Sequence, residues 1–380
     1  MALTYGFLST HPPTQCGLAT FNSALATSLI ARTGSGGVVR VTTDRSAGRP
    51  EPHVVHTWTA GEVAGWRRAA SALNRYSVAV VQHEYGIYPG TDGWDVLPLL
   101  RSLTVPSIVV LHTVLATPTT RQKALLEQIV AAAGAVVTMT ETARDRLCAG
   151  YAVDAAKVAV IPHGVTRHSG APAVRREVPH LLTWGLLGPG KGIEWALRAL
   201  ARLVDLDPTP TYTVAGRTHP KVLERHGEAY RTGLHQLGAQ LGISSHVSYD
   251  AVYRDDASLS RLIRSADVVV LPYDSREQVT SGVLIEAVAA GVPVVATRFP
   301  HAVELLGGGG PGLLVPHQNP TALATALRRV LTEPGLAAGL VGRAPGSTAT
   351  LEWPAVAARY DDLGRTLLAE RPTALAAATA

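Results

Sequence analysis

Short runs of valine, isoleucine, leucine and threonine recur along the chain, separated by alanine-rich stretches with helical character. Apolar runs of this length that alternate with helices are typical of parallel strands buried on both faces. The first half predicts strands at residues 3–9, 38–43, 53–58, 78–83, 107–112, 135–139 and 158–162. The second half predicts strands at residues 181–186, 212–215, 247–249, 267–271, 293–297 and 313–315.

The pattern predicts an α/β chain with two Rossmann-like, doubly wound domains, at residues 1–168 and 169–350. Residues 166–180 carry prolines and charges without periodicity and are interpreted as the interdomain linker. Residues 351–380 predict a last helix, which could cross back to the N-terminal domain, and a frayed tail. Ligands of such sheets bind outside the carboxyl ends of the strands, so we expect the two domains to face each other across a cleft.

Composition narrows the class of protein. Of the 380 residues, 46% are hydrophobic and 17% charged, which is typical of globular proteins. The net charge of +5 is spread out, without a basic block, so no nucleic-acid partner is expected, whereas peripheral contact with a membrane stays open. With 2 cysteines, no signal-peptide pattern and no apolar run of membrane-spanning length, we expect a cytoplasmic chain without a transmembrane segment.

Polar residues follow several strands of the first half. Gly17 precedes a predicted helix, where backbone N–H groups could approach an anion, although an ordinary strand-to-helix turn would look the same. His83, Glu84 and Tyr85 follow the strand at 78–83, and either line a ligand site or order their own loop. His112 follows the next strand and could donate to a sugar or phosphate, or be a satisfied buried histidine.

No metal ion or other cofactor is expected from the residues. Neither His83 nor His112 has the helical spacing of a zinc site, and the sequence has no cluster of cysteine and histidine. A metal held by side chains alone is therefore not predicted.

A glycine-rich loop, "GLLGPGKGIE", joins a strand to a helix in the second half. Gly190 and Lys191 lie in it, and such a loop suits a phosphate held by backbone amides and one ammonium. It has neither the Walker spacing nor the Gly-x-Gly-x-x-Gly fingerprint of nicotinamide enzymes, and it could also be a surface loop. Arg217 directly follows another strand and either clamps a phosphate oxygen or faces solvent.

The segment "SGVLIEAVAAGVPVVAT" holds one carboxylate, Glu286, in an otherwise apolar helical run. Burying an unpaired charge costs several kcal/mol, roughly, so Glu286 needs solvent or a polar partner. A helix starts near Ser281, and Gly282 and Val283 present free N–H groups to an anion. Glu286 lies more than one turn farther in, where it could accept hydrogen bonds from a diol, as the ribose of a nucleotide offers.

Together these residues resemble the family 4 retaining glycosyltransferases, which have the two-domain GT-B fold. The resemblance runs from "FLSTHPPTQCGLATF" through "VQHEYGIY", "LHTVL", "IPHGV" and "GLLGPGKGIE" to the segment that carries Glu286. It implies that the C-terminal domain binds a nucleoside diphosphate sugar and the N-terminal domain an acceptor, for which His83, Glu84 and Tyr85 are candidates.

The same resemblance implies individual roles. Glu286 would bind ribose, and Lys191 would hold the diphosphate together with amides near Gly17 and Gly190 and at 281–283. His112 would approach the transferred sugar. Family members commonly carry a glutamate where this chain has Gln278, and many have an arginine six residues before the lysine, where this chain has Gly185. Arg217 is the candidate replacement for the missing charge.

The function implied is retaining transfer of a sugar from a nucleoside diphosphate sugar to an acceptor hydroxyl. Alternatives are a GT-B epimerase, a phosphorylase-like enzyme, a non-catalytic sugar-nucleotide-binding protein and a nicotinamide dehydrogenase. A phosphorylase needs a pyridoxal phosphate lysine, for which Lys221 is a poor candidate. The donor's sugar and base, the acceptor and the oligomeric state stay open.

Overall fold

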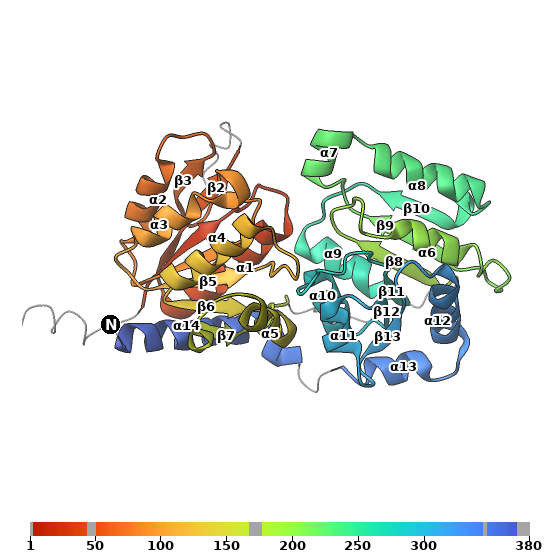
Figure 1. The fold of residues 1–380 in the computed structure, drawn as a ribbon. Coiled ribbons are helices and arrows are strands. Elements are labelled where there is room, and N and C mark those ends of the chain that lie inside the picture. Colours follow the sequence, from red (N-terminus) through yellow and green to blue (C-terminus); the bar gives the residue numbers. More distant parts are fainter. Residues whose placement is uncertain (1–2, 44–50, 167–176, 345–347, 371–380) are drawn as a thin grey trace, which may run out of the picture. The chain divides into compact units, whose positions relative to one another are not determined.

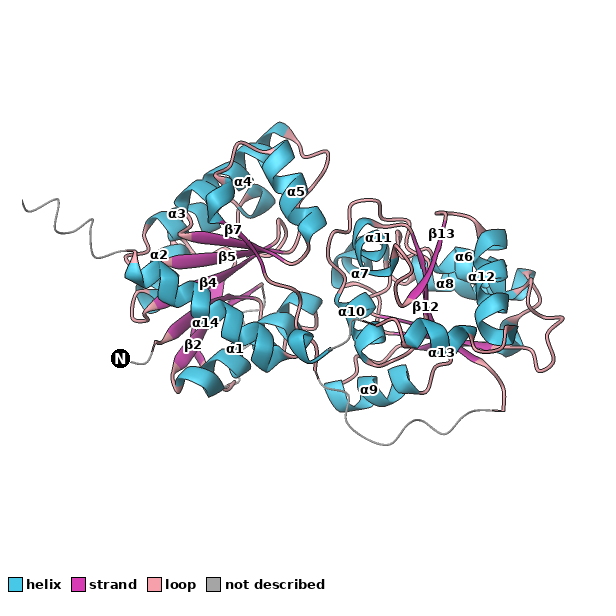
Figure 2. Ribbon diagram, turned by 90° about the horizontal axis from the view of Figure 1, so that it is seen from below, coloured by secondary structure: helices cyan, strands magenta, loops and turns pink. Residues whose placement is uncertain are grey.

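The computed structural model describes residues 3–43, 51–166, 177–344 and 348–370. The chain divides into two compact units, one made of Met1–Gly164 with Ala349–Ala380 and the other of Val165–Thr348. Each unit holds one parallel sheet covered by helices (Figures 1 and 2). The proposed linker at 166–180 lies mostly outside the described residues, as does the tail beyond residue 370.

In the described part of the first unit, a sheet of 7 parallel strands has the order β3-β2-β1-β4-β5-β6-β7. The strands are β1 (Tyr5–Ser9), β2 (Gly36–Thr42), β3 (Val54–Thr59), β4 (Val78–His83), β5 (Ser107–Leu111), β6 (Ala135–Thr138) and β7 (Val158–Val160). The helices are α1 (Gly17–Thr33), α2 (Gly65–Leu73), α3 (Val96–Arg101), α4 (Thr120–Ala132), α5 (Glu141–Gly150) and α14 (Trp353–Ala369). The strand order changes direction between β1 and β4, which is the place where open α/β sheets bind ligands.

The described second unit has a sheet of 6 parallel strands in the order β10-β9-β8-β11-β12-β13. The strands are β8 (His180–Trp184), β9 (Thr211–Ala215), β10 (Val247–Asp250), β11 (Val268–Leu271), β12 (Val294–Thr297) and β13 (Gly312–Val315). The helices are α6 (Ile193–Leu200), α7 (Pro220–His226), α8 (Ala229–Gln240), α9 (Asp256–Arg264), α10 (Gly282–Ala289), α11 (Pro300–Leu306), α12 (Pro320–Thr332) and α13 (Leu336–Val341). Every strand that the sequence predicts is present, with ends that differ by at most about two residues, and the α/β fold class is confirmed.

The last helix, α14, completes the core of the first unit although it lies far from it in sequence. It packs beside α1 and contributes Trp353, Val356 and Tyr360 to the core that Tyr5 and Phe7 of β1 also form (Figure 2). The chain therefore returns to its first sheet after it has formed the second.

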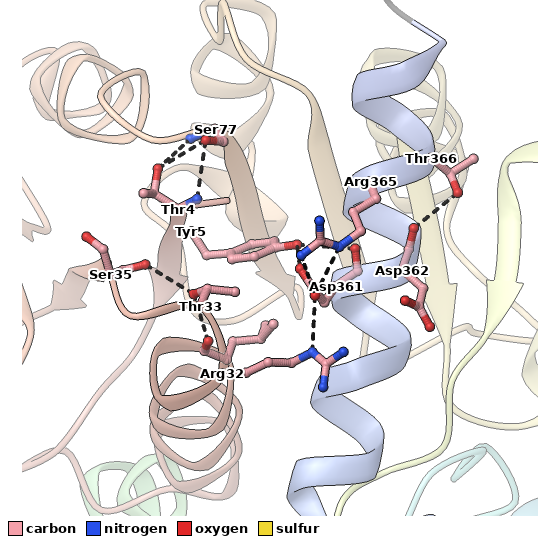
Figure 3. A network of polar contacts seen from close by, with 11 residues as sticks. Thr4, Tyr5, Arg32, Thr33, Ser35, Ser77, Asp361, Asp362, Arg365 and Thr366 are labelled. Atoms are coloured by element: carbon pink, nitrogen blue, oxygen red, sulfur yellow. Dashed lines mark hydrogen bonds and ion pairs between the residues drawn. The ribbon is translucent and has the colours of Figure 1, made fainter. Parts of the chain in front are cut away.

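A buried carboxylate anchors α14. Asp361, with 1% of its surface exposed, accepts hydrogen bonds from the Tyr5 hydroxyl at 2.9 Å, Arg32 Nε at 3.1 Å and Arg365 at 3.0 Å (Figure 3). Burial alone raises the pKa of Asp361, but these hydrogen bonds outweigh it and leave the pKa below its ordinary value. The charge is tolerated in the interior because three donors share it.

Among the described residues, none of the helices is both long and apolar enough to cross a membrane.

Candidate nucleotide site

The predicted site residues of the second unit lie in loops that follow β8, β9 and β11. Because the strands of this sheet are parallel, their carboxyl ends, and the loops after them, lie at one edge. Gly190 and Lys191 follow β8, Arg217 follows β9, and residues 278–286 follow β11. The fold therefore brings these residues to the same edge of one sheet.

The glycine-rich loop is held tightly against the loop after β11. Gly192 has a φ of +63°, and a Cβ at this position would lie 1.9 Å from the carbonyl oxygen of Pro272. The Asp274 N–H donates to the Gly190 carbonyl at 2.9 Å, and the Trp195 indole N–H donates to Asp274 Oδ2 at 3.0 Å. Glycine at 192 is thus required by the close approach of two loops.

The ammonium of Lys191 lies over the ring of Tyr273, with 4.3 Å between Nζ and the ring centroid. Such a cation–π contact orients the charge and leaves its three hydrogen-bond donors available. Within the described chain, Lys191 has no carboxylate at ion-pair distance. Burial, Lys221 and then Lys191 lower the pKa of the neighbouring His219. The ammonium is therefore a positive charge available to an anion.

The start of α10 presents two amides. Ser281 caps the helix, and its Oγ accepts from the Leu284 N–H at 3.2 Å. The Ser281 N–H, which was expected among the donors to the diphosphate, already donates to His301 Nδ1 at 2.7 Å. Gly282 and Val283 are the first two helical residues, whose N–H groups have no partner within the helix.

Glu286 lies on α10 and is partly buried. Burial raises its pKa from 4.5 to about 7, the Trp184 indole N–H opposes this by a hydrogen bond to the carboxylate, and Asp256 adds to the rise. Trp184 is the last residue of β8 and is 4% exposed. The indole N–H of Trp184 is therefore a polar group that favours the ionised form of Glu286.

Gln278 and Arg217 both take part in hydrogen bonds that involve the backbone of loops. The Gln278 Nε2 donates to the Thr280 carbonyl at 3.2 Å, so its amide folds back on its own loop. Arg217 is exposed, and its carbonyl accepts from the Leu187 N–H at 2.8 Å. Among the described residues, the Gln278 side chain makes no hydrogen bond to Lys191 or Glu286.

In the first unit, His83 ends β4, and His112 directly follows the neighbouring strand β5. His112 Nε2 is 2.8 Å from the Gln82 Oε1, and burial lowers the pKa of His112 to about 3. His83 is 1% exposed, its pKa is lowered to about 4 by burial, and neither ring nitrogen has a partner in the described residues. Both imidazoles are therefore neutral at physiological pH, which suits hydrogen bonds to uncharged hydroxyl groups.

The other candidates of the first unit order their own surroundings. The Glu84 carboxylate accepts from the Thr113 hydroxyl at 2.9 Å, and the Tyr85 hydroxyl donates to the Gln122 carbonyl at 3.4 Å. Gly17 is the first residue of α1, and a Cβ placed on it would meet nothing within 4 Å. Glycine at 17 is thus not imposed by packing, and the space beside it is open.

Sequence reasoning overlooked three residues at these edges: Trp184, Asp274 and His301. Trp184 ends β8 and Asp274 follows β11, whereas His301 lies on α11, the helix after β12. The rule that selects residues after strands could therefore have found Trp184 and Asp274, but not which atoms they contact. Among the described residues, no group of three or more histidine, cysteine, aspartate or glutamate side chains is placed to hold a metal ion.

Known families match both halves of the chain. The profile described as "Glycosyltransferase Family 4" matches residues 17–169, and the profile described as "Glycosyl transferases group 1" matches residues 178–333. The chain belongs to the family 4 glycosyltransferases. The two matches lie on separate units, as expected for the GT-B fold.

Curated relatives of this family 4 chain are named D-inositol 3-phosphate glycosyltransferase. The protein from Streptomyces bingchenggensis is 30% identical over 255 residues, which are 62% of this chain and 54% of that protein. The one from Acidothermus cellulolyticus is 30% identical over 261 residues, which are 65% of this chain and 56% of that protein. The chain thus spans little more than half the length of the curated relatives it matches.

Solved structures share the GT-B fold. Sucrose-phosphate synthase from Thermosynechococcus elongatus has a TM-score of 0.77 and 20% identity, covering 97% of this chain and 100% of that one. HepE of Anabaena in complex with UDP-glucose has a TM-score of 0.74 and 17% identity, covering 96% and 100%. At such identities the likeness establishes the fold, GT-B, and nothing finer.

Proposed function

We propose that this family 4 protein is a retaining glycosyltransferase that moves a sugar from a nucleoside diphosphate sugar to an acceptor hydroxyl. The observation that carries the proposal is the arrangement at one edge of the second sheet. Among the described residues, an ammonium without a carboxylate partner lies in the loop after β8, and two helix-terminal amides and a partly buried carboxylate lie on α10. These groups suit a diphosphate beside a vicinal diol.

The roles follow from the chemistry of each group. Lys191 and the N–H groups of Gly282 and Val283 would bind the diphosphate, and Glu286 would accept hydrogen bonds from the ribose hydroxyls. As the sugar leaves, negative charge grows on the diphosphate, so cationic and amide donors aimed at it stabilise the transition state more than the ground state. Gly190 and Gly17 would allow backbone to approach the donor.

The remaining assignments are proposals of the same kind. His112 would bind the transferred sugar and Gln278 its hydroxyls, while Arg217 would supply charge near the diphosphate. We propose that the acceptor binds to the first unit, with His83, Glu84 and Tyr85 as candidates. Retention is proposed through attack on the same face, with a donor phosphate oxygen taking the acceptor proton.

The names of similar proteins suggest the first substrates to try. HepE was solved with UDP-glucose, and the curated relatives are named for D-inositol 3-phosphate. We therefore propose a UDP-sugar as the donor and a phosphorylated polyol as the first acceptor to test. The relatives extend beyond the matched region, so both substrates belong to the proposal.

The test is a panel of sugar nucleotides, first for thermal stabilisation and then for transfer. A ligand at ~100 times its dissociation constant adds about 2.7 kcal/mol to the free energy of unfolding. We expect at least one sugar nucleotide to stabilise the protein and to yield a product whose anomeric configuration, read by NMR, equals that of the donor. An inverted product would refute retention, and stabilisation by none of the panel would refute the donor site.

The alternatives give different results in the same assays. A phosphorylase-like enzyme would require free phosphate, an epimerase would change the donor without an acceptor, and a binding protein would be stabilised without turnover. A nicotinamide dehydrogenase would change the absorbance of its cofactor. The variant Glu286→Gln is the matched control, because it keeps the side chain's size but removes the carboxylate.

A further inference from the structure

His301 ties together the loop that leads into α10. It lies on α11, and its side chain is 4% exposed. Its Nδ1 accepts the Ser281 N–H at 2.7 Å, and its own backbone N–H donates to the Gln278 carbonyl at 3.3 Å. One buried residue therefore holds both ends of the segment 278–281, which is 20 residues or more away in sequence.

The hydrogen bond from Ser281 determines which nitrogen of the His301 ring carries no proton. A backbone N–H can only donate, so the Nδ1 that faces Ser281 carries no proton and acts as an acceptor. Ser281 is thereby held in an extended conformation, with φ −140° and ψ 105°, which is typical of an N-cap residue. In this conformation its Oγ accepts from the Leu284 N–H.

The consequence is a defined set of free donors. Of the amides at 281–284, Ser281 is used by His301 and Leu284 by the Ser281 hydroxyl. Gly282 and Val283 are left, and both are partly exposed. His301 thus determines which N–H groups a bound anion can meet and how they are oriented.

We propose that His301 is a positioning residue for the donor diphosphate, acting through the Ser281 N–H on the amides of Gly282 and Val283. This inference rests on the proposed function, because it names a determinant of the same donor site. It assigns the effect to one atom, the Nδ1 acceptor, and not to the bulk of the imidazole.

Three substitutions at His301 separate the effect of the Nδ1 acceptor from the effect of the volume of the side chain. His301→Asn places an amide oxygen where Nδ1 lies, His301→Gln places its polar atoms one bond farther out, and His301→Leu fills the space without an acceptor. His180→Leu is the control for general damage, because His180 is also buried in the second unit but lies at the start of β8.

The measurement is the dissociation constant of UDP by calorimetry, with the donor KM and kcat beside it. We expect His301→Leu and His301→Gln to weaken UDP binding at least tenfold, with most of the kinetic effect in KM. His301→Asn should stay within about threefold of the wild type, and His180→Leu should lower thermal stability without changing UDP affinity. Amide hydrogen exchange at Ser281 should be fast in the Leu and Gln variants and slow in the Asn variant.

Specific outcomes overturn the inference. Equal UDP affinity in all folded variants would show that His301 does not position the donor, while the proposed function would stand. Equal loss in the Asn, Gln and Leu variants would show that the ring's shape matters and not its acceptor. If the Leu variant does not fold, the comparison of Asn with Gln decides. If the wild type binds neither UDP nor any other nucleoside diphosphate, the proposed function fails, and this inference falls with it.

Discussion

Replacing Glu286 by glutamine should make the free protein more stable and the donor complex weaker. Burial raises the pKa of Glu286 from 4.5 to about 7, so the ionised form is disfavoured in the native state. A shift of one pKa unit corresponds to about 1.4 kcal/mol, which puts the cost of the charge at up to about 3 kcal/mol. Solvent at the exposed part of the side chain reduces this value. Glutamine keeps an acceptor for the Trp184 indole and carries no charge.

The pH dependence of this gain has a definite direction. Because the native pKa lies above the unfolded one, the native state holds the proton more strongly between pH 4.5 and 7. The wild type therefore pays no penalty from Glu286 below pH 4.5, loses stability as the pH rises to 7, and keeps the full penalty above that. The stability difference between Glu286→Gln and wild type should be small at pH 4.5 and largest at pH 8.

The assay is urea unfolding of both proteins at pH 5 and pH 8, followed by circular dichroism and tryptophan fluorescence. Two units need not unfold together, so the comparison is made on the transition that Glu286→Gln shifts. A gain of about 1–3 kcal/mol at pH 8, with little gain at pH 5, is expected. The same gain in the free energy of unfolding at both pH values, or a loss at pH 8, would refute the claim that burial destabilises the ionised carboxylate. UDP binding should weaken about tenfold or more, since hydrogen bonds to charged groups contribute ~1.5–3 kcal/mol.

Lys191→Ala should lower turnover at least tenfold, about 1.4 kcal/mol, and near-normal steady-state kinetics would exclude Lys191 from the diphosphate site. Gly17→Ala should change the unfolding free energy by less than about 0.5 kcal/mol, because its Cβ meets nothing, while donor binding should weaken; unchanged binding by calorimetry would place the ligand elsewhere. Gly192→Ala should instead destabilise by at least about 1–2 kcal/mol, since its φ is +63° and Pro272 blocks a Cβ; a thermal melt equal to the wild type's would contradict this close approach. Asp361→Ala should cost about 1–3 kcal/mol in chemical denaturation, because the buried hydroxyl of Tyr5 loses its carboxylate acceptor and keeps only the longer contact to the Asp361 carbonyl. A cost no larger than that of truncating the exposed Arg365 side chain would count against a role in anchoring α14.

The strands were predictable because they are short runs of three to seven residues, most of them apolar, and this signal lies within a short window of sequence. The order of the strands within each sheet was not predictable, because strand pairing depends on how the helices cross over between strands and not on local composition. Glu286 was recognisable because a carboxylate is expensive among apolar neighbours, wherever the chain goes next. Lys191 was recognisable because glycines surround it.

The partners of these residues could not be predicted. Trp184 precedes Glu286 by about a hundred residues, and His301 follows Ser281 by twenty, so only the folded sheet brings them together. The family resemblance implied that the Ser281 amide also contacts the diphosphate, whereas in the structure this amide donates to His301. The Asp361 network was missed for the same reason, since its donors on β1 and α1 come from the other end of the chain.

The return of α14 to the first sheet makes the second unit an insertion between Gly164 and Ala349. A truncation after residue 164 would therefore remove α14 from the core of the first unit. A short linker that joins residue 164 to residue 349 would keep α14 in that core. The second unit, by contrast, is continuous and suited to separate expression. Separating the two units therefore requires removal of residues 165–348 as one segment, because a single cut would divide the first unit.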